Sequence, residues 1–217
     1  MDLEIVLGLS PLEADIWMLP WALAFLVGST MTPRIVRKIP LILIIAGGLA
    51  VTAVGFGILI QIDASTSFLF LSIGLVILSL GLAPVLILTT DLVVGSAPPE
   101  CAGTASAISE TTAELGGSLG IAVLGSIGTS IYRTEFTRTI PAGIPLDAQE
   151  AAIESLGRAK SLAEHLPNGL GSVLFDIALD SFIQGLQFTV IISTAVAAVT
   201  ALVFVKLRKV RINSEQN

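Results

Sequence analysis

The sequence predicts an all-α integral membrane protein with five transmembrane helices and one amphipathic helix outside the bilayer. Of its 217 residues, 53% are hydrophobic and 13% are charged, and its mean hydropathy is +0.91. A soluble domain usually carries about twice that share of charged residues, about 25%. The chain also holds long runs without Asp, Glu, Lys or Arg, and a helix needs about 20 such residues to cross the hydrocarbon core. A bilayer is therefore the solvent that this composition fits.

Five segments are long enough to span the membrane: residues 16–33, 41–60, 64–90, 101–132 and 181–205. The fourth is interrupted only by Glu110 and Glu114. We therefore divide the chain into an outer segment (1–15), four transmembrane helices (16–132), an extracytoplasmic loop (133–180), a fifth transmembrane helix (181–206) and a cytoplasmic tail (207–217).

The basic residues of the short connections predict the orientation of the chain. Clusters of Lys and Arg follow the first and the fifth spans, and such clusters favour the cytoplasmic side. The residues are Arg34, Arg37 and Lys38 in the first cluster and Lys206, Arg208, Lys209 and Arg211 in the second. Five spans place both clusters on the same side, so we expect a multi-pass protein of the bacterial inner membrane with a cytoplasmic C-terminus.

The long loop contains a helix signal near residues 147–168. Asp147 and Glu150 have the spacing of a capping box, and Asn168-Gly169 can end the helix. An apolar stripe follows the expected helix: Ile153, Leu156, Ala159, Ala163 and Leu166. We interpret this helix as packing on the outer face of the protein or on lipid headgroups. A gating role is the alternative.

Glu110 and Glu114 are the main candidates for a functional site. If the fourth helix begins near Ala102, they lie about 12 Å and about 18 Å into a core about 30 Å thick. Residues four apart share a helix face, and a charged carboxylate at mid-membrane costs about 3 kcal/mol. Their face should point into a bundle or an aqueous cavity, where the pair could exchange protons or meet a cationic substrate. The alternative is a hydrogen-bonded pair that only fixes helix packing.

Other residues of the spans leave two interpretations open. Asp91 ends the third span and is either at the cytoplasmic mouth of a pathway or an interfacial acid in water.

Gly116 and Gly120 have the small-xxx-small spacing of close helix contacts, and Pro84 can kink the third span. Both features fit a bundle whose helices rock and a static bundle.

Several functions are excluded by what the chain lacks. Its net charge of -6 argues against a nucleic-acid partner. A single cysteine, Cys101, allows neither an intrachain disulfide nor a cysteine metal cluster. Residues 116–120 match G-x-S-x-G, but Ser118 lies within a membrane span and the single histidine, His165, lies in the outer loop. No phosphate-binding loop motif occurs. We therefore expect no enzyme, no cofactor and no metal site.

With these elements placed, two stretches resemble multidrug exporters of the major facilitator superfamily, of the QacA/SmvA/EmrB type. They are "VLGLSPLEADIWMLPWALAFLVGSTMTPRIVRK" (6–38) and, more specifically, "TTDLVVGSAPPECAGTASAISETTAELGGSLGIAVLGSIGTSIY" (89–132). The resemblance covers the C-terminal portion of such a transporter. It implies that the five spans are the last of fourteen, and that the family exchanges protons for cationic lipophilic drugs such as antiseptics and dyes. It also implies a proton-coupling or substrate role for Glu110, Glu114 and Asp91.

The resemblance also has two departures. The acidic position of the facilitator loop motif is absent between Ser29 and Thr32, which weakens a gating role for the basic residues that follow. Facilitators work between two pseudo-symmetric halves, and no N-terminal half is present here. We expect a partial sequence, a split gene product or a truncated product that needs the missing half as its partner. The alternative function is a non-transporting remnant or accessory protein that packs against another transporter.

Overall fold

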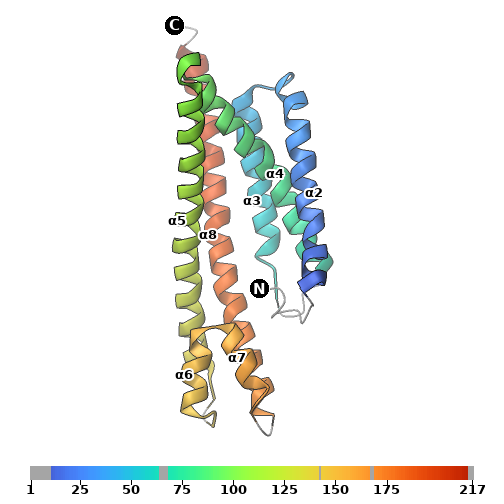
Figure 1. The fold of residues 1–217 in the computed structure, drawn as a ribbon, viewed down its shortest axis with the longest axis vertical. Helices are drawn as coiled ribbons and strands as arrows, with labels where there is room; N and C mark the ends of the chain where they lie inside the picture. Colours follow the sequence, from blue (N-terminus) through green and yellow to red (C-terminus); the bar gives the residue numbers. More distant parts are fainter. Residues whose placement is uncertain (1–10, 64–67, 142, 167–168, 215–217) are drawn as a thin grey trace. The chain divides into compact units, whose positions relative to one another are not determined.

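The computed structural model describes residues 11–63, 68–141, 143–166 and 169–214, and all of its main elements are helices (Figure 1). They are α2 (Pro11–Val36), α3 (Leu41–Leu59), α4 (Phe68–Gly95), a 3-10 turn (Pro99–Cys101), α5 (Ala102–Thr139), α6 (Leu146–Glu154), α7 (Leu156–Ala163) and α8 (Leu170–Ser214). The predicted all-α class is confirmed. Of the predicted outer segment, residues 1–10 lie outside the described part of the chain, as do residues 215–217 of the predicted tail.

Four helices in the described part of the chain are long and apolar enough to cross a membrane. These candidate spans are Leu41–Leu59, Leu69–Gly95, Pro99–Thr139 and Leu170–Lys206. They overlap the second to fifth predicted spans. The third span was predicted to start at residue 64, which lies outside the described residues. The first predicted span lies on α2, which is helical over 26 residues but is not among the four. The number of five spans therefore stays a prediction.

The fourth and fifth spans belong to helices that are longer than the predicted transmembrane segments. α5 has 38 residues, which is about 57 Å of helix against a hydrocarbon core of about 30 Å. α8 has 45 residues. The loop predicted over 133–180 is therefore helical at both ends, because charged residues such as Arg133 and Arg138 mark where a helix can leave the hydrocarbon and do not end it.

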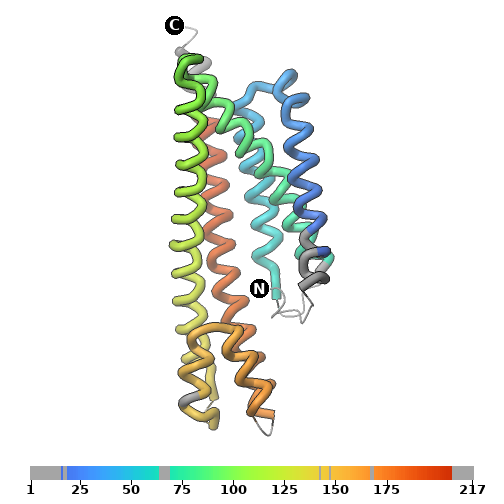
Figure 2. Tube along the Cα trace, viewed as in Figure 1, coloured from blue at the N-terminus to red at the C-terminus, as the bar shows by residue number. Residues whose placement is uncertain are grey.

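Contacts between Cα atoms divide the helices into two compact units. Figure 2 colours the chain by residue number, so the ranges of each unit can be found in it. The first, the α2–α4 unit, comprises Leu19–Ile60, Ser67–Ile121 and Val190–Asn217. The second contains Ala122–Thr189, with the outer ends of α5 and α8 and both short helices. We call the described residues of Ala122–Thr189 the hairpin module.

Close glycine contacts join α3 to α4 in the α2–α4 unit. A Cβ atom on Gly48 would lie 2.6 Å from the carbonyl oxygen of Gly81 and 2.8 Å from Val85 Cγ2. A Cβ atom on Gly81 would in turn lie 2.6 Å from the Gly48 carbonyl oxygen. The two backbones therefore touch, which is how small residues stabilise helix pairs in lipid. A small apolar core follows: Ile44, Ile45, Val85 and Leu88, with Phe204 of α8 packed against it.

We predict that Gly48→Val destabilises the α3–α4 pair, because the new side chain would meet backbone that cannot move aside. Overpacking of this kind costs about 1–3 kcal/mol. Thermal unfolding in detergent should show a lower midpoint than for Gly47→Val. The latter is the matched control, since a Cβ atom on Gly47 meets nothing within 4 Å. Equal midpoints would contradict the contact.

The hairpin module has its own apolar core. Its buried residues come from all four helices and the connection before α6: Tyr132, Phe136, Ile144, Ala148, Ala152, Leu156, Ala159, Leu174 and Ala178. The predicted apolar stripe is part of this core, since Leu156 and Ala159 are buried and Ile153 and Leu166 pack against it. Of the two surfaces predicted for the stripe, the outer face of the protein or the lipid headgroups, these described residues pack on the protein.

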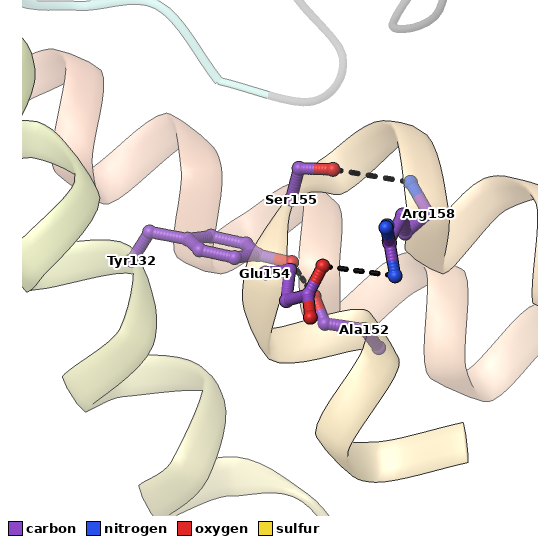
Figure 3. A network of polar contacts seen from close by, with 5 residues as sticks. All are labelled: Tyr132, Ala152, Glu154, Ser155 and Arg158. Atoms are coloured by element: carbon purple, nitrogen blue, oxygen red, sulfur yellow. Dashed lines mark hydrogen bonds and ion pairs between the residues drawn. The ribbon is translucent and has the colours of Figure 1, made fainter. Parts of the chain in front are cut away.

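The predicted helix near 147–168 is two helices. Asp147 was predicted to cap the helix, and this is wrong: α6 begins at Leu146 after Pro145, so Asp147 lies inside the helix. Ser155 has extended backbone and caps α7, its hydroxyl accepting a hydrogen bond from the Arg158 amide at 3.3 Å (Figure 3). α7 ends at Ala163, before the predicted stop at Asn168-Gly169; Asn168 lies outside the described residues. Gly169 adopts a φ of 75° directly before α8.

Candidate functional site

Glu110 and Glu114 both lie in the first half of α5, within a candidate membrane span. The helix begins at Ala102, as predicted, because the Pro98-Pro99 turn cannot continue as α-helix. The two carboxylates are four positions apart, so one helix face carries both. Both side chains are exposed within this chain. The helix therefore presents two acids on a surface of membrane-spanning length.

No described side chain of this chain forms a hydrogen bond or ion pair with either carboxylate. The neighbouring hydroxyls are committed to the backbone: Thr111 donates to the carbonyl of Ala107 at 2.8 Å, and Thr112 donates to that of Ile108 at 2.7 Å. Both threonine hydroxyls therefore bind within their own helix and not to the carboxylates. The alternative of a hydrogen-bonded pair that fixes packing finds no partner among the described residues. Bare carboxylates are costly in lipid, and the described residues leave this face uncovered.

The same half of α5 holds glycines that face open space. A Cβ atom on Gly116, Gly117 or Gly120 would meet nothing within 4 Å. Gly116 and Gly120 were predicted to mark close helix contacts, but they make none with the described residues. The described glycines of this unit that lie tightly against a neighbouring backbone are instead Gly48, Gly55 and Gly81 on α3 and α4. Gly81 was missed, although its seven-residue spacing from Gly74 repeats on one face of α4.

Asp91 lies on α4, four residues before the helix ends at Gly95, and its side chain is exposed. Next to it, Thr89 donates to the Val85 carbonyl at 2.7 Å and Thr90 to that of Leu86 at 3.2 Å. The structure gives no contact between Asp91 and the α5 carboxylates. Both predicted interpretations of Asp91, pathway mouth and interfacial acid, remain predictions.

Ser118 lies in the middle of α5, with helix on both sides. A nucleophile elbow needs a strand, a sharp turn and a helix, so this serine is not an active-site nucleophile of that type. His165 is exposed after α7, with its ring nitrogen 2.8 Å from the Ser161 carbonyl oxygen. Among the described residues, no group of three or more His, Cys, Asp or Glu side chains could hold a metal ion.

Long apolar helices, close glycine contacts and an exposed acidic face define a multi-pass helical membrane protein. The sequence model of the Major Facilitator Superfamily matches residues 2–121, more than half of the chain. The protein therefore belongs to the Major Facilitator Superfamily. This superfamily consists of transport proteins, so the family agrees with the prediction of a transport protein and not an enzyme.

Three similar proteins illustrate the relationship. The chain is 33% identical to the multidrug efflux pump LfrA of Mycolicibacterium smegmatis, over 95% of this chain and 41% of that protein. It is 32% identical to the tetracenomycin C resistance and export protein of Streptomyces glaucescens, over 95% of this chain and 39% of the relative. It is 33% identical to the methyl viologen resistance protein SmvA of Salmonella typhimurium, over 84% of this chain and 36% of that protein.

The chain thus spans about two fifths of the length of the curated relatives it matches. No solved structure is significantly similar.

Proposed function

We propose that the chain is the C-terminal portion of a proton-coupled multidrug efflux transporter of the bacterial inner membrane. The observation that carries this proposal is the exposed Glu110 and Glu114 pair on a membrane-length helix. A carboxylate pair on one face can release or take up a proton as a cation arrives. Intramembrane acids are functional by default, because their insertion is costly.

The proposed substrates are cationic lipophilic compounds, including antiseptics and dyes. Two carboxylates offer negative charge to such a cation, and no described Lys or Arg side chain is paired with them. The names of the relatives support export of organic compounds. One is named for resistance to methyl viologen, itself an organic cation. Asp91, near the inner end of α4, is the proposed third acid of the pathway.

The proposed partner is the portion of a facilitator that lies outside the region matched here. Facilitators transport between two halves, and the relatives are about two and a half times as long as this chain. The open face of α5, with its acids and glycines, is a surface on which that portion could pack. Five spans with the C-terminus in the cytoplasm remain the proposed topology.

The test is a fusion in which this chain replaces the matched region of LfrA. We expect the fusion to export a lipophilic cationic dye from cells that lack their own exporters, and the chain alone to export none. Membrane levels of both proteins are compared by immunoblot. A fusion that reaches the membrane at normal levels and exports no dye would favour the alternative, a non-transporting or accessory protein.

A further inference from the structure

The hairpin module holds α5 and α8 together at two separate places. We propose that it is a clamp, which makes the outer halves of these two helices one rigid element. In a transport cycle, the outer half of α5, the helix whose first half carries Glu110 and Glu114, would then move only together with the outer half of α8. The functional consequence rests on the proposed function, whereas the clamp itself is tested without any transport.

The first attachment is the contact of Gly128 with Gly185. A Cβ atom on Gly185 would lie 2.7 Å from the Gly128 carbonyl oxygen, and one on Gly128 would lie 3.2 Å from Thr189 Cγ2. The helix backbones therefore touch here. A contact this close allows no side chain to slide between the helices, and it is the arrangement by which small residues stabilise helix pairs in lipid.

The second attachment is the apolar core of the module, where α6 and α7 join α5 to α8. Tyr132 and Phe136 of α5 stack with their ring centroids 5.8 Å apart, and Leu174 and Ala178 of α8 are fully buried in the same core. The Tyr132 hydroxyl also donates a 2.7 Å hydrogen bond to the Ala152 carbonyl (Figure 3). That carbonyl is in the last turn of α6, where the helix offers it no amide.

The two attachments lie at different heights along the helices. At about 1.5 Å per residue, Gly128 lies about 6–12 Å along α5 from the two aromatic residues of the core. Gly185 lies about 11–17 Å along α8 from Ala178 and Leu174. A helix pair that is joined at one point can pivot, but a pair joined at points one to three turns apart cannot pivot without breaking one of the contacts. The geometry therefore points to a rigid pair.

A disulfide across the glycine contact tests the clamp. In a Cys101→Ser background, Gly128→Cys and Thr189→Cys should cross-link almost completely under mild oxidation, because a Cβ atom on Gly128 points at the Thr189 side chain. The control pair combines Gly125→Cys with Thr189→Cys, since a Cβ atom on Gly125 meets nothing within 4 Å. We expect little cross-linking there. Equal yields from both pairs would overturn the proposed contact.

Hydrogen exchange of the full chain in lipid nanodiscs tests whether α6 and the outer ends of α5 and α8 open as one cooperative unit. Tyr132→Phe removes one buried hydrogen bond and keeps the ring, so exchange should rise about fivefold. The clamp predicts this rise together in α6 and in the outer ends of α5 and α8, with α3 and α4 unchanged. A rise confined to α6 would overturn the proposal.

Transport then separates the clamp from the proposed function. In the LfrA fusion, the oxidised Gly128→Cys/Thr189→Cys protein should export dye within about twofold of the reduced protein, because a rigid pair loses nothing on cross-linking. Export that is lost on oxidation and restored by reduction would refute the clamp. A reduced fusion that reaches the membrane and exports no dye would contradict the proposed function instead, and the cross-linking yields and exchange rates would still decide the clamp.

Discussion

Dye export by the LfrA fusion falls to background when both Glu110 and Glu114 are replaced by glutamine. Glutamine keeps the size and the hydrogen-bonding capacity of glutamate but can neither release a proton nor carry a negative charge. The structure gives neither carboxylate a described partner, so no packing or ion pair within the described residues is lost on substitution. The loss of export would therefore report chemistry and not folding. Initial rates of dye efflux in energised cells are the measurement.

Single substitutions and a matched control sharpen this prediction. Glu110→Gln and Glu114→Gln made separately should each slow export, because the two groups act on one face. Glu100→Gln is the control, since Glu100 is an exposed acid in the turn before α5 and outside the predicted midplane. It should leave export unchanged. Wild-type rates of dye efflux in the double variant would contradict the assignment of the site to Glu110 and Glu114.

The second large effect is expected for Gly171→Ala, which should destabilise the hairpin module. A Cβ atom on Gly171 would collide with the carbonyl oxygen of Ala163, whose carbonyl carbon lies 2.9 Å from it. The neighbour is backbone at the end of α7, so it cannot turn aside as a side chain could. We expect a loss of about 1–3 kcal/mol from the hairpin module. Proteolysis of the α6–α7 connection in intact membranes should become faster.

Alanine at another glycine of the hairpin module should have the opposite effect on the stability of the module. Gly125 faces open space in the middle of α5, so alanine meets no obstacle there. Alanine is favoured over glycine inside a helix by about 0.5–1 kcal/mol. Gly125→Ala should therefore leave proteolysis unchanged or slow it. Faster cleavage in both variants would show that the effect is unrelated to the Gly171 contact.

The spans and the acidic face could be predicted from composition and spacing. Runs without charge located four apolar helices, and a four-residue interval placed Glu110 and Glu114 on one face. The helix ends were harder, because a charge marks the edge of the hydrocarbon and does not stop a helix. Arg133 and Arg138 lie in α5, which continues to Thr139. Hydropathy indicates whether a segment lies in lipid or in water, whereas the ends of a helix depend on caps and packing.

The hairpin module shows what local patterns could not provide. The stripe from Ile153 to Leu166 keeps a helical period across Ser155, so periodicity alone predicted one helix. Ser155 ends one helix and caps the next because both can then pack on α5 and α8. The surroundings of Glu110 and Glu114 could not be predicted for a different reason. Their face is open among the described residues, so the spacing of the two acids does not say what packs against them.

Proton movement tests the central proposal most directly. The LfrA fusion is reconstituted in liposomes that contain a pH-sensitive fluorophore, and a cationic lipophilic dye is added on one side. A proton-coupled exporter predicts a proton flux opposite to the dye flux, which disappears in the Glu110→Gln/Glu114→Gln variant. Dye flux that continues at full rate without proton movement, or proton flux that survives in the variant, would contradict the role of the carboxylate pair.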